Sequence, residues 1–277
     1  MTLHVLVPSS LVRECRDKRE ATRKIGYVAR AATIFRASRV IVFPDTAGEG
    51  EATWDGGFVD TVLRYAVTPP HLRKDVWESR DELEAVGVLP PLRISTQTGS
   101  GSIDSGSLRQ GIVTEVGSDD RVRVNCGMQH PLSLRCPPDR EYREGERVFV
   151  RITSRRPIRA SLTDVPPPGP TIERMALEEA LDRPNSGLRI ATSRHGEPLT
   201  SRRLNELVQR IQRDGQTVAF GAPQRGLREI LEDQSGPDGD PPDGFDLWLN
   251  AIPDQGSDVV RTEEAMFAAL ACLTLTE

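Results

Sequence analysis

The 277-residue sequence has few of the residues that most often bind metals or form cross-links. It contains four cysteines and four histidines, and neither kind forms a pair at the spacing of a zinc or disulfide motif. We therefore expect no metal site, and we expect reduced cysteines that belong to the core. The cysteines are Cys15, Cys126, Cys136 and Cys272, and the histidines are His4, His71, His130 and His195.

Long apolar runs are also lacking. No stretch reaches the roughly eighteen residues that a membrane helix needs, and the amino terminus MTLHVLVPSSLV has no basic start of a secretory signal. We expect a cytoplasmic protein with no membrane partner. The chain is nevertheless long enough to form one large domain or two smaller ones, each with a real core.

Lysine is rare, because three of the 36 basic residues are lysines, and acidic residues outnumber basic ones to give a net charge of -5. Positive charge is concentrated locally, since residues 13–39 include nine basic and three acidic side chains. An acidic chain with a basic face can still bind a polyanion on that face.

Hydrophobic periodicity predicts an α/β fold with a parallel sheet. Strands over 4–8 and 39–44 flank a helix over about 11–37, which gives a β-α-β unit at the start. The same pattern resumes after residue 171. Strands are predicted there near 188–193, 217–223 and 245–250, and helices over 172–182, 201–214, 226–232 and the last residues.

The middle of the chain has a different pattern, typical of a small β-barrel. Four or five short strands of alternating residues are predicted, among them 110–116, 120–126, 130–136 and 146–152. The Gly- and Ser-rich STQTGSGSIDSGS precedes them and VPPPGP follows them, as linkers would. We therefore predict an α/β domain formed by residues 1–90 and 166–277, with a barrel domain of residues 91–165 inserted.

Three predicted strands end in small loops, TSRHG at 192–196, FGAPQRG at 220–226 and NAIPDQG at 250–256. At the carboxyl ends of parallel strands, such loops let a ligand approach the backbone closely. None of them fits a dinucleotide, P-loop or hydrolase motif. Together they predict a ligand pocket, followed by a helix that we expect Thr262 to cap.

The segments IATSRHG, VAFGAPQRG and NAIPDQGSDVVRTEEAMFAALACL, with the amino-terminal TRKIGYVARAATIFRASRVIVFPD, resemble the SPOUT class of RNA methyltransferases. The similarity is to its archaeal and eukaryotic branch, which carries an inserted oligonucleotide-binding-like (OB-like) barrel. It implies a Rossmann-like parallel sheet with a carboxy-terminal trefoil knot, a homodimer, S-adenosylmethionine as cofactor and RNA as substrate. That branch is linked to methylation at uridine N3 in ribosomal or other structured RNA.

Carried over onto this chain, the resemblance implies that the cofactor lies against the three loops. Leu249, Ile252 and Val260 would supply apolar walls for its adenine. The implied cofactor-binding residues are Thr192, Ser193, Gly221, Pro223, Gly226, Leu249, Ile252, Pro253, Gln255, Gly256, Val260 and Thr262.

Arginines are the candidates for catalysis and for RNA binding. Arg261, Arg225 and Arg194 could stabilise an anion that develops on the methyl acceptor, and the alternative is that they pair with acids or phosphates. Arg261 ranks first because it lies in the most specific motif. RNA is expected on a basic helix and on a basic strand of the barrel. Their residues are Arg16, Arg19, Arg23, Arg30, Arg151, Arg155 and Arg156.

Two other classes of function remain open. A non-catalytic RNA-binding or assembly factor with the same fold would be expected to lack cofactor glycines, yet Gly221, Gly226 and Gly256 are present. An α/β enzyme that acts on a small metabolite would leave the barrel and the basic helix without a role. The sequence therefore favours a methyltransferase.

Overall fold

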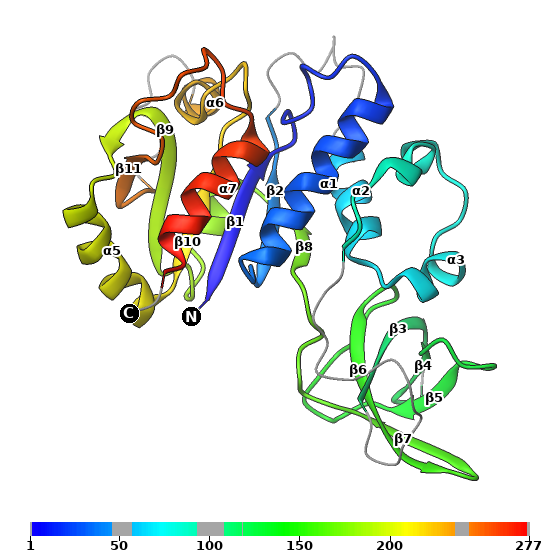
Figure 1. The fold of residues 1–277 in the computed structure, drawn as a ribbon. Helices are drawn as coiled ribbons and strands as arrows, with labels where there is room; N and C mark the ends of the chain where they lie inside the picture. The colour runs from blue at the N-terminus through cyan, green and yellow to red at the C-terminus, as the bar shows by residue number, and fades with distance from the viewer. Residues whose placement is uncertain (1, 46–56, 93–107, 118, 236–243, 276–277) are drawn as a thin grey trace. The chain divides into compact units, whose positions relative to one another are not determined.

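The chain forms a parallel and an antiparallel sheet, each in its own unit (Figure 1). The computed structural model describes residues 2–45, 57–92, 108–117, 119–235 and 244–275. The chain divides into a first compact unit of Met1–Val67, Glu82–Leu92 and Gly169–Glu277, and a second of Thr68–Asp81 and Arg93–Pro168. The domain boundaries at 91 and 165 stay a prediction. No helix within the described ranges is long and apolar enough to cross a membrane.

The first unit contains a six-stranded sheet whose order is β11-β9-β10-β1-β2-β8, with all neighbouring strands parallel. Every residue of β1 is buried, as expected for a parallel strand that is covered on both faces. The strands are β1 (Leu3–Pro8), β2 (Arg39–Phe43), β8 (Thr171–Arg174), β9 (Leu188–Pro198), β10 (Gln216–Ala219) and β11 (Leu247–Asn250).

Helices cover both faces of this sheet. On one face, Leu6 and Phe43 pack against Leu177 and Ile230, which belong to α4 and α6. Successive strand residues point to opposite faces, so Val5 next to Leu6 faces the other layer, where α1 and α7 lie side by side (Figure 1). The helices are α1 (Lys18–Ile34), α2 (Phe58–Val67), α4 (Leu177–Leu181), α5 (Ser201–Asp214), α6 (Leu227–Ser235) and α7 (Thr262–Leu273), with the 3-10 turns η2 (Asp81–Leu83) and η3 (Val86–Val88).

Two helix predictions need correction. The helix predicted over 172–182 begins as strand β8, in which Ile172 pairs with Val40 of β2. Tertiary pairing overrides the helical period here, because an edge of the sheet is open to a further strand. The first helix begins at Lys18 rather than near residue 11, because the Asp17 carboxylate accepts a hydrogen bond from the Glu20 N–H (2.7 Å) and caps it there.

The second unit contains a five-stranded antiparallel sheet, and the prediction of a barrel-like region is confirmed in this coarse form. The strand order is β5-β4-β3-β6-β7, and the edge strands β5 and β7 contact each other, so the sheet is nearly closed. Its interior holds Val113, Val124, Val150 and Ile152. The elements are β3 (Leu108–Val116), β4 (Arg121–Asn125), β5 (Leu132–Arg135), β6 (Arg147–Arg155) and β7 (Ile158–Leu162), with the helical turns η1 (Pro70–Leu72) and α3 (Arg73–Val76).

Candidate functional site

Strand β9 bulges where it passes β11. Ala191 pairs with Trp248, but the next residue of β11, Leu249, pairs with Glu197, so residues 192–196 of β9 project out of the ladder. The bulge closes at Gly196, where an added Cβ would lie 2.7 Å from the Leu249 carbonyl carbon and 2.9 Å from that of Trp248. Glycine is required there because backbone atoms fill the space of a side chain.

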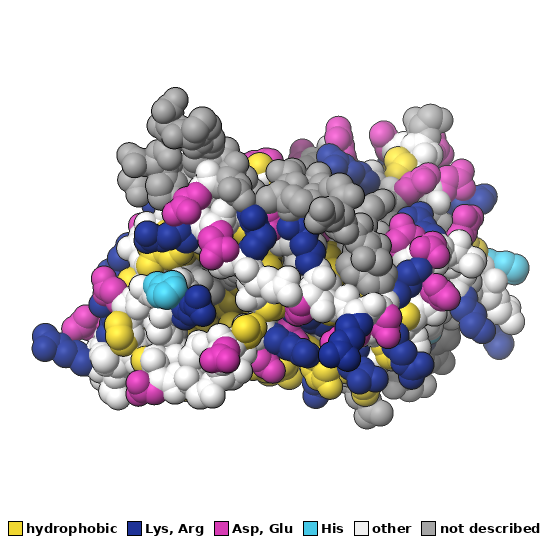
Figure 2. Space-filling model, turned by 90° about the horizontal axis from the view of Figure 1, so that it is seen from above, with side chains coloured by type: hydrophobic (Ala, Val, Ile, Leu, Met, Phe, Trp, Pro, Cys, Tyr) yellow, Lys and Arg dark blue, Asp and Glu magenta, His cyan; other side chains and the backbone are white. Residues whose placement is uncertain are grey.

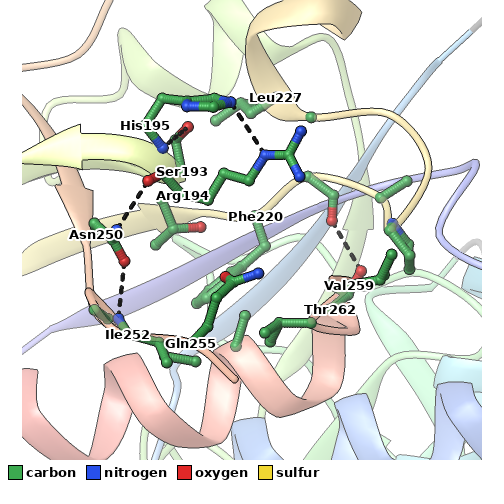
Figure 3. A pocket seen from close by; sticks show the side chains of 18 of the residues that line it. Ser193, Arg194, His195, Phe220, Leu227, Asn250, Ile252, Gln255, Val259 and Thr262 are labelled. Atoms are coloured by element: carbon green, nitrogen blue, oxygen red, sulfur yellow. Dashed lines mark hydrogen bonds between the residues drawn. The ribbon is translucent and has the colours of Figure 1, made fainter. Parts of the chain in front are cut away.

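Hydrogen bonds tie the bulge to the neighbouring strand ends (Figure 3). The Asn250 amide donates to the Arg194 carbonyl (2.8 Å), and its oxygen accepts from the Ile252 N–H (3.0 Å). The Thr192 hydroxyl donates to the Ala219 carbonyl (2.8 Å), which joins β9 to the end of β10. The three strand ends thereby form one rim.

The loop after β10 is fixed by α7. An added Cβ at Gly221 would lie 2.7 Å from the Leu227 nitrogen, so this turn also needs glycine. The Thr262 hydroxyl donates to the Gly221 carbonyl (2.8 Å). The predicted capping role of Thr262 is wrong, because Arg261 occupies the N-cap position and Glu264 accepts from its backbone N–H (2.9 Å). Thr262 instead joins the helix to the loop.

A cavity of about 480 Å³ lies among these loops and α7, at the carboxyl ends of β9, β10 and β11. Phe220, Leu249 and Ile252 line it with apolar surface, while Ser193 and Gln255 contribute polar groups (Figure 3). Volume and composition are those of a small-molecule site, in which apolar walls hold a ring and a few polar groups orient it.

Ten of the predicted cofactor-binding residues line this cavity. They are Thr192, Ser193, Gly221, Pro223, Gly226, Leu249, Ile252, Gln255, Val260 and Thr262. Pro253 and Gly256 are exposed and do not line it, and an added Cβ at Gly256 would meet no atom within 4 Å. The structure therefore brings the three loops together, and binding of the cofactor by their residues stays a prediction.

The three candidate catalytic arginines lie in different surroundings. Arg194 lines the cavity, and its Nε donates to His195 Nε2 (3.1 Å). Arg225 points to Asp45 (3.3 Å), as the pairing alternative anticipates. Arg261 turns away from the cavity and lies 3.9 Å from Glu20.

The residues predicted to bind RNA lie in both units. Arg16, Arg19 and Arg23 are exposed, whereas Arg30 donates to the Pro91 carbonyl (2.9 Å) and is half-buried. In the second unit, the side chains of Arg151 and Arg156 are exposed, and that of Arg155 lies outside the described residues. Contact of these arginines with RNA stays a prediction.

Sequence reasoning missed several residues of the cavity. Asn250 is one of them, although asparagine after a strand commonly forms the turn seen here. Ala265 and Ala269 lie four residues apart on α7 and leave room beside the loops. Phe220 and His195 also line the cavity, and no sequence pattern indicated a role for either at this site.

None of the described residues that line this cavity is a cysteine. Among the described residues, no group of three or more His, Cys, Asp or Glu side chains is placed to hold a metal ion. Burial raises the pKa of Cys15 and of Cys126 to about 12, so both thiols are protonated at neutral pH. Cys136 and Cys272 are half-buried and also free.

Comparison with known proteins identifies relatives along almost the whole chain. A family model described as "Putative RNA methyltransferase" matches residues 2–273. Uncharacterized proteins of Haloarcula marismortui and Halobacterium salinarum are each 63% identical over the full length of both chains. The human protein named 28S rRNA (uridine-N(3))-methyltransferase is 27% identical over 98% of this chain and 77% of its own length.

Proposed function

Because the chain belongs to the RNA methyltransferase family matched over residues 2–273, we propose that it transfers a methyl group from S-adenosylmethionine to RNA. The observation that carries this proposal is the cavity at the carboxyl ends of β9, β10 and β11, since these strand ends contain the loops that resemble the SPOUT class. The methyl donor would bind there.

The cavity suits the chemical parts of that donor. Leu249, Ile252 and Val260 present apolar surface for adenine, and Thr192 and Ser193 present hydroxyl groups for polar parts of the ligand. Gly221 keeps the loop after β10 close to the site, because a side chain there would collide with the Leu227 backbone. Gly256 and Pro253 have no such role in this proposal.

The bound donor supplies an electrophilic methyl group, so the protein's task is to position the acceptor and to manage its proton. An imide nitrogen such as uridine N3, the atom named for the human relative, becomes nucleophilic when its proton passes to water or to another base. Of the three candidate arginines, Arg194 lines the cavity, and its guanidinium would stabilise that anion. Arg225 forms an ion pair with Asp45 and has no part in this step.

The same proposal extends to fold and assembly. We infer that the segment around β11 and α7 forms the trefoil knot of the SPOUT class, that the antiparallel sheet is an OB-like inserted domain, and that the protein is a cytoplasmic homodimer. The exposed arginines of α1 and of β6 would contact RNA. These inferences rest on the resemblance and on the arrangement of the elements.

The first experiment is calorimetric titration of the purified protein with S-adenosylmethionine. Ala265→Leu should weaken binding about tenfold, equivalent to about 1.4 kcal/mol, because the longer side chain projects into the cavity. Ala271→Leu, on the exposed side of the same helix, is the matched control and should bind normally. Absence of binding by the folded parent protein would favour the non-catalytic RNA-binding alternative.

A further inference from the structure

The amino terminus of α7 separates two hollows. Val260 and Thr262 line the cavity described above, whereas Arg261 and Glu263 line a second hollow of about 350 Å³. Its other wall is the start of α1, including Arg19 and Tyr27. We call it the arginine hollow, after Arg19, Arg23 and Arg261. Figure 2 looks down on the carboxyl ends of the parallel strands, where Lys and Arg side chains gather beside hydrophobic ones.

The acidic groups of the arginine hollow already have partners within the protein. The Asp17 carboxylate caps α1 by accepting from the Glu20 N–H (2.7 Å). One Glu20 oxygen accepts from the Arg16 N–H (3.1 Å). Glu263 lies 3.7 Å from Lys24, which also pairs with Glu14. A single lysine thus faces the carboxylates of Glu14 and Glu263, whereas Asp17 and Glu20 each accept from a backbone N–H group.

The guanidinium groups, in contrast, are available to a ligand. Arg19 and Arg23 are exposed and lie four residues apart on one face of α1. Among the described residues, neither forms an ion pair or a hydrogen bond through its guanidinium group. The side chain of Arg261 is half exposed, and its contact with Glu20 is long at 3.9 Å. Two guanidinium groups with no acidic partner among the described residues, and a third with only a long contact to an acid, thus line one hollow.

We propose that the arginine hollow binds a backbone phosphate of single-stranded RNA, next to the nucleotide that enters the cavity. Guanidinium forks match phosphate oxygens in geometry and charge. Tyr27 is 41% exposed at the same hollow and offers a ring on which a neighbouring base can stack, a contact that free phosphate would not use. This inference rests on the proposed function, because it assumes that RNA is the substrate.

The shared α7 terminus gives the arginine hollow a role in positioning. Arg261 lies between Val260 and Thr262 in the chain, and both of these line the cavity. A phosphate held by Arg261 is therefore anchored to the segment that borders the donor site. Arg261 acts in this proposal on the RNA backbone and not on the methyl acceptor, which differs from the role expected from sequence.

Fluorescence anisotropy with a labelled single-stranded RNA of mixed sequence, over a series of KCl concentrations, tests the proposal. Arg19→Gln, Arg23→Gln and Arg261→Gln should each lower RNA affinity and reduce the slope of log K against log salt by about 0.7. Tyr27→Leu should lower affinity with the slope retained. Arg202→Gln is the matched control, since that side chain is 92% exposed on α5 away from the hollow.

Titration with S-adenosylmethionine, run on the same variants, keeps the two proposals distinguishable. Normal donor binding with reduced RNA affinity is the expected result. Unchanged RNA affinity and salt slope in the Arg19→Gln, Arg23→Gln double variant would overturn the phosphate site and leave the methyltransferase proposal standing. A parent protein that binds the donor but no RNA would also overturn the phosphate site. A parent protein that binds RNA but no donor would contradict the methyltransferase proposal.

Discussion

At the scale of single residues, Gly196 has a strict requirement, because two backbone carbonyl carbons lie within 3 Å of where its Cβ would be. Gly196→Ala should lower the free energy of unfolding by about 2 kcal/mol, through overpacking that cannot relax into a side chain. Urea denaturation measures this loss. Gly256→Ala is the matched control, because an added Cβ there meets nothing within 4 Å. Equal stability of both variants would contradict the described closure of the bulge.

His4 makes stability depend on pH. It is fully buried on β1, and neither ring nitrogen has a hydrogen-bond partner among the described residues. Burial, with Arg39 and Arg183 nearby, lowers the pKa of His4 from 6.5 to about 4. Between these values the unfolded chain binds more protons than the folded one, so His4 lowers the stability as pH falls from 6.5 toward 4.

The slope from this group should approach about 1.4 kcal/mol per pH unit within that window. His4→Leu removes the titrating group and should make the stability less dependent on pH between 4 and 6.5. Urea midpoints measured at several pH values compare the two proteins. Parallel pH profiles would show that His4 does not titrate differently in the folded and unfolded states.

The sequence predicted part of the cavity lining. The glycine-containing strand ends pointed to the cavity, and Leu249 and Ile252 do line it. The partners of Arg225 and Arg261 could not be predicted, because Asp45 and Glu20 are distant in sequence and meet them only in the fold. The position of Gly256 outside the cavity depends on how its loop turns, and loop composition does not determine that.

At the scale of elements, a buried ion cluster joins α1 to α7. Lys24 is 3% exposed and pairs with Glu14 and Glu263. Burial raises the pKa of Glu263. Lys24→Met should lower the free energy of unfolding by about 3 kcal/mol, since two carboxylates lose their cation in a poorly solvated place. Chemical denaturation at neutral pH measures the effect.

Lys18→Met on the same helix is the comparison for this cluster. Lys18 pairs with Glu84 at 3.1 Å, but the Glu84 side chain is 73% exposed, so the loss should stay below about 1 kcal/mol. Similar losses from both lysine variants would show that the buried cluster does not hold the two helices together. Neither variant removes an arginine of the hollow.

Elements with a clear period were the predictable part of the fold. The strand LHVLVP and the helix over 201–214 follow from their apolar spacing. The strand β8 was predicted as helix, because its pairing with β2 is a tertiary contact that local spacing does not encode. The bulge in β9 could not be predicted from local spacing either, because the register of a strand depends on both paired strands.

At the scale of the whole molecule, the proposed dimer is directly testable. Light scattering after size-exclusion chromatography should give about twice the 30.6 kDa of one chain. The proposed SPOUT-type dimer would place the active site between subunits, so dilution that separates the subunits should also lower methyl transfer. A single-chain mass in a preparation that transfers methyl groups to RNA would contradict the dimer and leave the transferase proposal intact.

The strand order has a consequence for how this protein is made. Strand β1 lies between β2 and β10, and Leu3 pairs with Gln216. During synthesis, β1 can therefore pair with β10 only after the residues up to Ala219 have been made. Pairing between segments so distant in sequence is slow to form. The loop after β10 also depends on a later segment, because the Thr262 hydroxyl of α7 donates to the Gly221 carbonyl. A nascent chain thus lacks one wall of the cavity until α7 has been synthesised.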